Sequence, residues 1–354
     1  MRKEHHHRNP VNRALHRLAV PASLSLVLAL QATAAAAGDS ATIVMYPNFA
    51  DEAAGTSAIK LEQFDAHLKE ITSGKYAVLP LPEIIAALKE HRPLPDRALA
   101  ITIDEAHLAI YTEAWPRLRR AGLPFTLFVA TDPVDTKAPG YMSWDQVREL
   151  ARSGVVIGNL TSSEPHMTEQ EPARAASEIA AASQRIKDEI GTAPTLFAYP
   201  YGEWGSEIRQ QVIDAGFAAA FGQQSGVTYG GSDWYSLPRF VMSEAYGGLE
   251  RFRLAASALP LRVRDVTPED PVLRRNPPAL GFTVLSGNDG LDRLACFASN
   301  QSGPTQLERL GEGRIEIRVA KPFPPGRSRV NCTMPGPDDR WRWFGLQLYV
   351  PMPH

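Results

Sequence analysis

The stretch AITIDEAH, residues 100–107, ends a β-branched run in two adjacent carboxylates. Carboxylates such as Asp104 and Glu105 can act in general acid–base chemistry or bind a metal ion, and His107 adds an imidazole two residues further along. Asp104 by itself has another interpretation, because a carboxylate at a strand end often caps the helix that follows. The segment is therefore either a catalytic site or an ordinary strand end.

Three later stretches place polar side chains directly after short apolar runs. They are GNLTSSEPH at 158–166, AYPYG at 198–202 and LPR at 237–239. Their carboxylates, imidazole, aromatic rings and guanidinium could join the carboxylates at 104–105 in one site. Such a site requires a fold that brings several strand ends together.

The residues before position 260 alternate between β-rich runs and segments with helical spacing. Leu61, Phe64, Leu68 and Ile71, for example, fall on one face of a helix. The alternation predicts βαβ units around a parallel sheet, about seven in all, which suits a (β/α) barrel. In such barrels reactive residues lie where the strands end. We expect strands at 42–46, 76–79, 98–103, 125–130, 155–157, 196–199 and 218–221, and helices at 61–71, 81–88, 112–121, 143–154, 171–190 and 206–215.

The character of the sequence changes after residue 260. Residues 265–278 are rich in proline and charge and predict a linker between a domain at 38–264 and a small all-β module at 279–354. Cys296 and Cys332 lie on two β-like runs of this module. In an exported chain such a pair favours a disulfide, with two buried thiols as the alternative.

Residues 1–37 have the pattern of an export signal. Five Lys or Arg residues flank the start of an apolar run at 18–30, and small residues at 34–37 offer a cleavage site after Ala37. The run is short for a membrane span, so we expect no stable span and a periplasmic or secreted protein, with an uncleaved anchor as the alternative. Without this segment the formal net charge changes from −2 to −6, because five bases and one acid are lost. That mild acidity argues against a nucleic-acid partner.

Taken in order, the four polar stretches resemble the motifs of the polysaccharide deacetylases of the NodB-homology type. The likeness covers residues 42–262 and is closest to the exported branch that acts on N-acetylglucosamine polymers. It implies a NodB-type barrel, metal-assisted hydrolysis of an acetamide, and a polysaccharide containing N-acetylated amino sugars as partner. In this family one aspartate is the general base, and a second aspartate and two histidines hold a divalent ion such as zinc.

By this resemblance Asp104 matches the catalytic base, and Tyr201 matches the residue whose backbone N–H stabilises the oxyanion. Aromatic residues gather around the motif loops in sequence. Their faces can stack on sugar rings. Trp144 and Tyr199 are equally compatible with a core position. The expected substrate-binding residues are Trp144, Tyr199, Trp204, Trp234 and Arg239.

The family's metal-ligand positions are substituted in this chain. Glu105 stands in place of the aspartate, Glu164 in place of the second histidine, and Leu160, which has no donor atom, in place of the first. Among the five histidines after residue 37, only His107 and His166 lie near the motifs. Glu105, Glu164 and His166 could still hold a divalent metal. The alternative is that Leu160 packs on apolar neighbours and no metal binds.

Two functions follow from these observations. The first is an enzyme that hydrolyses N-acetyl groups of an amino-sugar polymer in the cell envelope. The second is a catalytically inactive protein of the same fold, a pseudoenzyme that binds polysaccharide without cutting it. The fold supports both functions, because function depends on the site and not on the fold alone.

Overall fold

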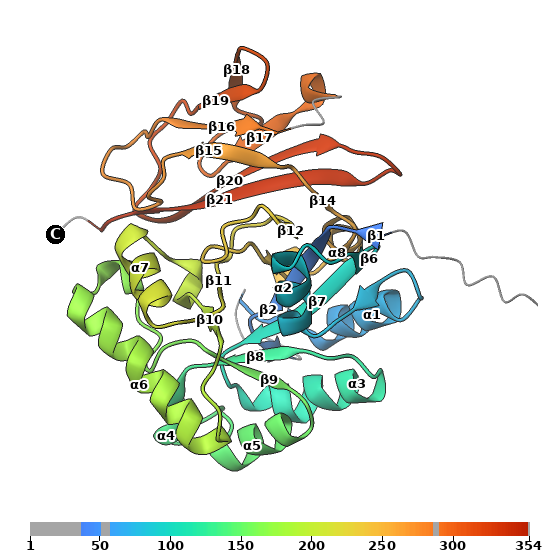
Figure 1. Cartoon of the computed structure of the whole chain (residues 1–354), viewed down its shortest axis with the longest axis vertical. Coiled ribbons are helices and arrows are strands. Elements are labelled where there is room, and N and C mark those ends of the chain that lie inside the picture. Colours follow the sequence, from blue (N-terminus) through green and yellow to red (C-terminus); the bar gives the residue numbers. More distant parts are fainter. Residues whose placement is uncertain (1–36, 51–56, 286–289, 353–354) are drawn as a thin grey trace, which may run out of the picture. The chain divides into compact units, whose positions relative to one another are not determined.

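A curled sheet of parallel strands forms the first part of the structure (Figure 1). The computed structural model describes residues 37–50, 57–285 and 290–352, so the expected export signal lies outside the described residues except for Ala37. Strand order is β11–β10–β9–β8–β7–β2–β12, and all neighbours are parallel except β2 and β12. The strands are β2 (Ser40–Tyr46), β7 (Ala98–Asp104), β8 (Thr126–Val129), β9 (Val156–Asn159), β10 (Leu196–Ala198), β11 (Ala219–Phe221) and β12 (Thr228–Tyr229).

A further segment, residues 237–241, connects β11 with β2. Leu237 forms a parallel bridge with Phe221 at the end of β11, and β13 (Phe240–Val241) pairs in parallel with β2. The segment therefore continues the curl from β11 round to β2. This arrangement confirms the predicted NodB-type barrel of parallel strands.

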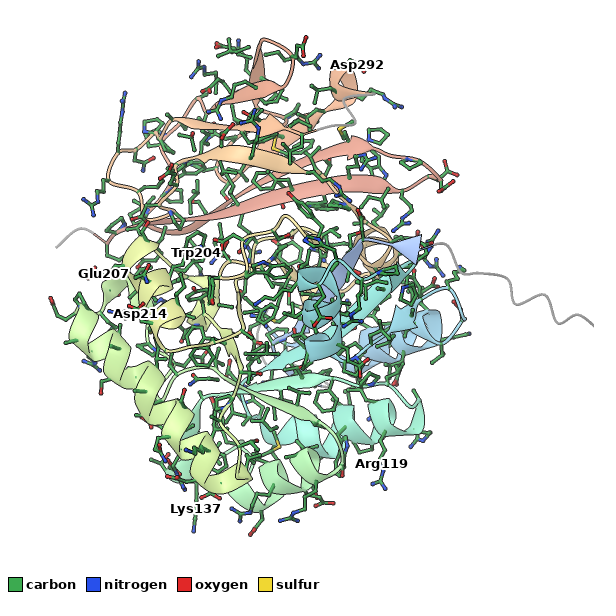
Figure 2. All side chains as sticks on the ribbon, viewed as in Figure 1. Arg119, Lys137, Trp204, Glu207, Asp214 and Asp292 are labelled. Atoms are coloured by element: carbon green, nitrogen blue, oxygen red, sulfur yellow. A yellow bond between two sulfur atoms is a disulfide. The ribbon has the colours of Figure 1, made fainter. Side chains whose placement is uncertain are left out.

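The two faces of β7 pack against different apolar groups, as the alternation of side chains along a strand requires. Leu99, Ile101 and Ile103 pack in the cluster that the helices α1, α3 and α5 cover. Ala98 and Ala100 point to the opposite, interior face, which α2 also contacts. Side chains fill the space on both sides of the sheet (Figure 2). Asp104 follows Ala100 at a spacing of four and therefore points to the interior.

The helices agree closely with the predicted positions. The helix expected to begin at residue 143 does so with a capping box between Ser143 and Gln146. The helix expected at 112–121 differs, because a π-helical turn at Ile110–Ala114 precedes it. The helices are α1 (Leu61–Ile71), α2 (Leu81–Lys89), α3 (Trp115–Arg120), α4 (Thr131–Asp135), α5 (Trp144–Arg152), α6 (Pro172–Ile190), α7 (Ser206–Asp214) and α8 (Leu249–Ala256).

Two four-stranded sheets form the C-terminal part and enclose their own apolar core. One has the order β14–β21–β20–β17, with β14 and β21 parallel and the other pairs antiparallel. The other, β15–β16–β19–β18, is antiparallel throughout. The strands are β14 (Leu259–Pro260), β15 (Val263–Thr267), β16 (Leu280–Val284), β17 (Ala295–Ala298), β18 (Gln306–Leu310), β19 (Arg314–Arg318), β20 (Gly326–Pro335) and β21 (Trp341–Val350).

The β domain expected at the C-terminus is thus present, but β15 occupies the start of the stretch expected to be a linker, 265–278. The described residues form one compact unit that includes the barrel and the C-terminal sheets. The domain boundaries at 264 and 279 therefore remain a proposal from composition.

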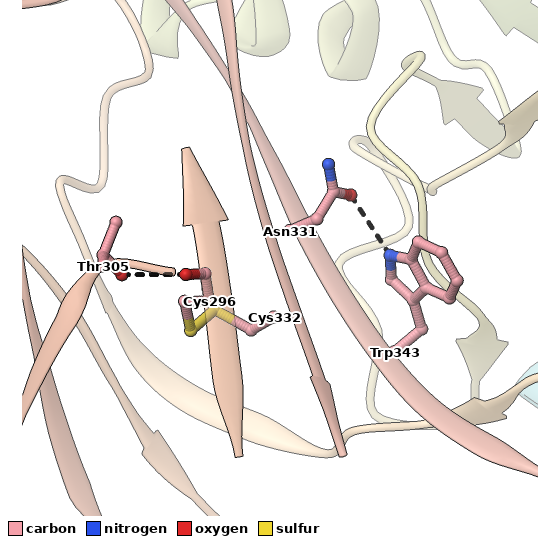
Figure 3. The surroundings of a disulfide bond; sticks show 5 residues. All are labelled: Cys296, Thr305, Asn331, Cys332 and Trp343. Atoms are coloured by element: carbon pink, nitrogen blue, oxygen red, sulfur yellow. Dashed lines mark hydrogen bonds between the residues drawn. A yellow bond between two sulfur atoms is a disulfide. The ribbon is translucent and has the colours of Figure 1, made fainter. Parts of the chain in front are cut away.

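Cys296 on β17 and Cys332 on β20 face each other directly and form a disulfide (Figure 3). Both cysteines are buried in the core of the two C-terminal sheets. Nearby, Trp343 donates its indole N–H to Asn331 and packs edge-on against Phe240 of the barrel. Within the described part of the chain, no helix has the length and apolar character needed to cross a membrane.

Candidate functional site

Asp104 ends β7 with both of its carboxylate oxygens held by Arg239. Arg239 Nη1 and Nη2 donate to Oδ1 and Oδ2 at 2.6 and 2.8 Å, and Nε donates to the carbonyl oxygen of Gly222 at 2.9 Å. Arg239 is 0% exposed and Asp104 is 4% exposed. Burial raises the pKa of Asp104, while Arg239 acts in the opposite direction. The segment 237–241 closes the sheet and thereby supplies the cation that the Asp104 carboxylate needs.

Glu105 follows directly and adopts a left-handed backbone conformation, with φ of 63°. Its Oε2 lies 2.6 Å from His107 Nε2 and accepts a hydrogen bond of 3.1 Å from the hydroxyl of Tyr141. His107 and Tyr141 also form a β-bridge, and their rings lie 4.5 Å apart. The Glu105 carboxylate is therefore already bonded to two side chains of this chain.

The loop after β9 is held by hydrogen bonds from two directions. Asn159 Oδ1 accepts from the N–H of Thr161 at 2.6 Å, and Asn159 Nδ2 donates to the carbonyl oxygen of Ile179 in α6. Thr161 Oγ1 in turn accepts from the N–H of Glu164 at 3.1 Å. At the start of this motif, a Cβ on Gly158 would lie 2.4 Å from the Phe128 ring, so only glycine fits there.

Glu164 combines partial burial with two negative neighbours. Burial, and then the charges of Glu105 and Asp104, raise its pKa to about 9. Glu164 therefore carries a proton near neutral pH, whereas an ordinary glutamate is ionised. The site thus holds a carboxylic acid beside carboxylates, which is the composition that general acid–base chemistry requires.

Leu160 lies in the apolar cluster on the interior face of the sheet and is 1% exposed. Phe128, Phe221 and Leu237 belong to the same cluster. A packed aliphatic side chain therefore stands at the position that matches the family's first metal-binding histidine. This packing agrees with the alternative that Leu160 contacts apolar neighbours.

Tyr201 lies in a short 3₁₀ turn, Pro200–Gly202, and also has a left-handed backbone, with φ of 56°. Its ring stacks on His166 with centroids 4.4 Å apart. His166 is itself bonded through Nδ1 to Glu203 Oε2 at 2.9 Å, with its side chain 48% exposed. The Tyr201 carbonyl accepts a hydrogen bond of 2.9 Å from Gln347 on β21.

Each of the three motif loops contains a non-glycine residue with positive φ: Glu105 in the first, Thr161 and Glu164 in the second, and Tyr201 in the third. Such conformations cost about 1–3 kcal/mol each and are retained where surrounding contacts enforce them. Seven further non-glycine residues of the described chain, outside these loops, have the same conformation, so positive φ alone does not mark the site. The expected convergence of the motifs is supported by the charges of Glu105 and Asp104 that act on Glu164.

These residues do not fit the divalent-metal centre that the family resemblance implies. Leu160 has no donor, Glu105 is bonded to His107 and Tyr141, and His166 is bonded to Glu203. Among the residues that the structure describes, no group of three or more His, Cys, Asp or Glu side chains is arranged to hold a metal ion. The expected set of Glu105, Glu164 and His166 is thus not assembled as a ligand set.

Several residues expected to bind substrate occupy other positions. Arg239 and Tyr199 are fully buried, and Trp144 is 8% exposed, so their side chains lie inside the protein and do not line an open groove. Trp234 packs against the interior cluster beside Lys89 at the end of α2, near the start of β11 and away from the edge where Asp104 lies. Trp204 is half-buried and remains accessible.

Comparison with known proteins supports the resemblance to the polysaccharide deacetylases. Residues 91–220 match the family model described as polysaccharide deacetylase. The matched range contains the first three motifs, whereas Arg239 lies beyond it.

Two curated relatives illustrate the extent of the likeness. A putative polysaccharide deacetylase of Bacillus subtilis, YxkH, is 22% identical over 187 residues, which are 53% of this chain and 66% of that protein. The poly-β-1,6-N-acetyl-D-glucosamine N-deacetylase of Escherichia coli is 25% identical over 248 residues, covering 56% of this chain and 36% of that protein. The chain therefore spans less than two thirds of the length of either relative.

Among solved structures, the deacetylase PplD of Streptococcus pyogenes matches with a TM-score of 0.58 at 17% identity, covering 61% of this chain and 98% of that one. This match supports the fold. Two features of the site were missed from the sequence: the contacts of Tyr141 with Glu105 and of Glu203 with His166. Neither pairing has a signal in the local spacing of the sequence.

Proposed function

We propose that this protein acts on a polysaccharide containing N-acetylated amino sugars in the cell envelope and hydrolyses its N-acetyl groups. The observation that carries the proposal is the buried Asp104–Arg239 pair at the end of β7, beside Glu105 and Glu164. The match of residues 91–220 to the polysaccharide deacetylase family model supports the reaction class. The substrate class is supported by the name of the Escherichia coli relative, a poly-β-1,6-N-acetyl-D-glucosamine N-deacetylase.

The proposed reaction breaks the amide C–N bond of the acetamide group. Water supplies its oxygen and one hydrogen to the acetyl group and its other hydrogen to the nitrogen, which gives acetic acid and a free amine; transfer of a proton between these products gives acetate and an ammonium group. The reaction needs a base that accepts a proton from water and an acid that donates one to the nitrogen. Asp104 occupies the position of the family base, and Glu164, with a pKa of about 9, holds a proton that it can donate. Tyr201 occupies the position whose N–H stabilises the oxyanion.

A second candidate function is binding of the same polymer without hydrolysis. It is favoured by the burial of Leu160 in the interior cluster, because a packed aliphatic side chain cannot complete the metal centre that the family uses. Under this candidate the motif loops bind the polysaccharide and release no acetate.

Acetate release from a hexasaccharide of β-1,6-linked N-acetylglucosamine distinguishes the two candidates. Hydrolysis predicts acetate release by the native chain and its loss in Asp104→Asn, with the exposed Asp292→Asn as matched control. Binding of the hexasaccharide by the native chain without acetate release would support the second candidate instead. Repeating the assay with a chelator shows whether a divalent metal contributes, as the family resemblance implies.

Export to the periplasm or the medium forms part of the proposal, since an envelope polymer lies outside the cytoplasm. It is supported by the pattern at 1–37 and by the disulfide between Cys296 and Cys332, which persists in oxidising compartments. Fractionation of cells, with N-terminal sequencing of the mature protein, tests the expected cut after Ala37.

A further inference from the structure

Two arginines on β20 point away from the core of the C-terminal sheets. Val330 and Cys332 of the same strand belong to that core. Because side chains alternate along a strand, Arg327 and Arg329 lie on the opposite face, toward the barrel. The contact of Arg327 agrees with this direction, since its guanidinium carbon lies 5.4 Å from the centre of the Tyr201 ring. The pair of arginines therefore begins beside the third motif loop.

The guanidinium of Arg329 has no partner in the part of the chain that the structure describes. Its backbone N–H donates to the Ser299 hydroxyl at 2.9 Å, but its side chain takes part in no hydrogen bond, ion pair or ring contact there. Arg329 is half-buried, and none of its side-chain nitrogens is fully enclosed, so a ligand in solvent can reach them. A cation that is partly removed from water without a counter-ion is costly to the fold. A bound anion would offset that cost.

The charges that act on Arg329 increase this cost. Burial, and then the charge of Arg327, lower the pKa of Arg329. Burial also lowers the pKa of Arg251 in α8, and the charge of Arg329 lowers it further, while Tyr246 acts in the opposite direction. Within the described chain, neither Arg251 nor Arg329 forms an ion pair with an acidic side chain. Both guanidiniums remain charged at neutral pH and repel each other.

The contacts of the other two arginines supply little negative charge. Arg251 Nη1 donates to two carbonyl oxygens, at 3.1 and 3.0 Å, and its guanidinium carbon lies 5.1 Å from the centre of the Tyr246 ring. Arg327 Nε lies 3.5 Å from Glu203 Oε1, and the other oxygen of that carboxylate is bonded to His166. Three guanidiniums therefore have one carboxylate near them, and that carboxylate already has a second partner.

Guanidinium groups recognise carboxylates and phosphates best, because two oxygens of one anion can accept two parallel N–H bonds. A neutral sugar would leave the charge of Arg329 uncompensated. A polymer that occupies the third motif loop passes beside these arginines, since Arg327 lies over Tyr201. The chemistry of the three side chains therefore favours an anionic group, and their position favours one that a polymer carries.

We propose that Arg251, Arg327 and Arg329 form a site, the arginine site, for a carboxylate or phosphate group carried by the polysaccharide that the motif loops bind. The assignment of this anion to a polysaccharide rests on the proposed function, whereas the anion site itself does not.

Three oligomers test the arginine site on the full chain: a galacturonate hexamer, a glycerol phosphate hexamer and the neutral β-1,6-linked N-acetylglucosamine hexasaccharide. The two acidic oligomers distinguish a carboxylate from a phosphate. Arg329→Gln should weaken binding of the preferred acidic oligomer about tenfold, because a charge-assisted contact is lost, and should leave binding of the neutral hexasaccharide unchanged. Arg329→Gln removes no side-chain contact within the described chain, so its unfolding midpoint should not fall.

Arg318→Gln is the matched control. It removes the same charge from β19 in the other C-terminal sheet, where Arg318 pairs with Glu308, and it should bind all three oligomers as the native chain does. Failure of the native chain to bind either acidic oligomer, or equal binding by the native chain and Arg329→Gln, contradicts the proposal. An equal loss in Arg329→Gln and Arg318→Gln also contradicts it, because the effect would then follow net charge alone.

Vesicles that contain phosphatidylglycerol test a different partner. Vesicle binding that Arg329→Gln abolishes, with neither acidic oligomer bound, would overturn the polysaccharide assignment in favour of a membrane surface. Hydrogen exchange locates the bound oligomer: the proposal expects slower amide exchange at 327–331 and 244–251 in the native chain but not in Arg329→Gln. Protection confined to other segments would reject the arginine site.

These experiments separate the arginine site from the proposed function. Binding of an acidic oligomer at the arginine site, by a chain that releases no acetate from the neutral hexasaccharide, keeps the site and rejects the hydrolytic function. Acetate release by a chain that binds neither acidic oligomer keeps the hydrolytic function and rejects the arginine site.

Discussion

Arg239 holds both carboxylate oxygens of Asp104, at 2.6 and 2.8 Å, in a pair that solvent hardly reaches. The pair joins the end of β7 to the segment 237–241, two parts of the barrel separated by 135 residues in the chain. A carboxylate held in this way keeps one orientation, which a catalytic base requires. The same contact therefore contributes to the stability of the barrel and to the geometry of the site.

Removal of Arg239 should destabilise the fold strongly. Arg239→Ala leaves the Asp104 carboxylate buried without its cation, and we expect the free energy of unfolding to fall by about 3–5 kcal/mol in urea titrations. The control is Arg318→Ala, which breaks the exposed pair with Glu308 and should change the free energy of unfolding far less. Similar losses in the two variants would contradict the prediction that the buried pair contributes more to the free energy of unfolding than an exposed pair does.

Glu164 should make stability depend on pH. Its folded pKa of about 9 lies above the ordinary glutamate value of 4.5, so between these pH values the folded chain holds a proton that the unfolded chain has released. The free energy of unfolding therefore falls as pH rises through this window. Glu164→Gln has no such proton to release. As pH rises through this window, the free energy of unfolding of Glu164→Gln should therefore increase relative to that of the native chain by up to about 1.4 kcal/mol per pH unit.

Urea unfolding from pH 5 to pH 9, with chelator present throughout, measures this difference for Glu164→Gln. The exposed Glu207→Gln serves as control and should run parallel to the native chain. A difference between Glu164→Gln and the native chain that stays constant with pH would contradict the raised pKa.

Restoring the family's ligand types should create a metal site. The triple variant Glu105→Asp, Leu160→His and Glu164→His should bind zinc at least about a hundredfold more tightly than the native chain, because zinc prefers imidazole and a short carboxylate in tetrahedral geometry. Competition with a zinc indicator measures the affinity. The double variant that keeps Leu160 isolates the contribution of that position. If the native chain already binds zinc as tightly as the triple variant, Leu160 has not removed the site.

Loss of the disulfide should weaken the C-terminal sheets. Cys296 and Cys332 are separated by 36 residues, and closing a loop of that length stabilises a fold by about 3–4 kcal/mol in the chain-entropy account. Replacement of both cysteines by alanine should lower the free energy of unfolding by this order. The native chain with reductant provides an independent control, and an unchanged unfolding midpoint in both cases would contradict the prediction.

The sequence was most informative where the signal is local. The helix at 61–71 and the start of a helix at residue 143 follow from patterns within a few residues, and both are present as predicted. The end of a β-branched run at Asp104 follows from the same kind of pattern. Local periodicity therefore specified the elements and the edge at which the carboxylates lie.

What the sequence did not predict depends on contacts between distant residues. The segment 237–241 gives a weak strand signal, because Pro238 and Arg239 interrupt its apolar pattern, and its partners β2 and β11 were therefore not evident. For the same reason Arg239 was expected to face substrate, although it lies inside the barrel. The burial of Tyr199 and Trp144 is also set by packing that one-dimensional spacing does not encode.

The hydrogen bond from Gln347 to the Tyr201 carbonyl joins residues 146 positions apart, and the Arg327 guanidinium lies over the Tyr201 ring. The last strands thus brace the third motif from outside the barrel. A truncated chain that keeps the barrel but lacks β20 and β21 would lose the contacts that support the turn at 200–202. Such a truncation would therefore change the third motif as well as shorten the protein.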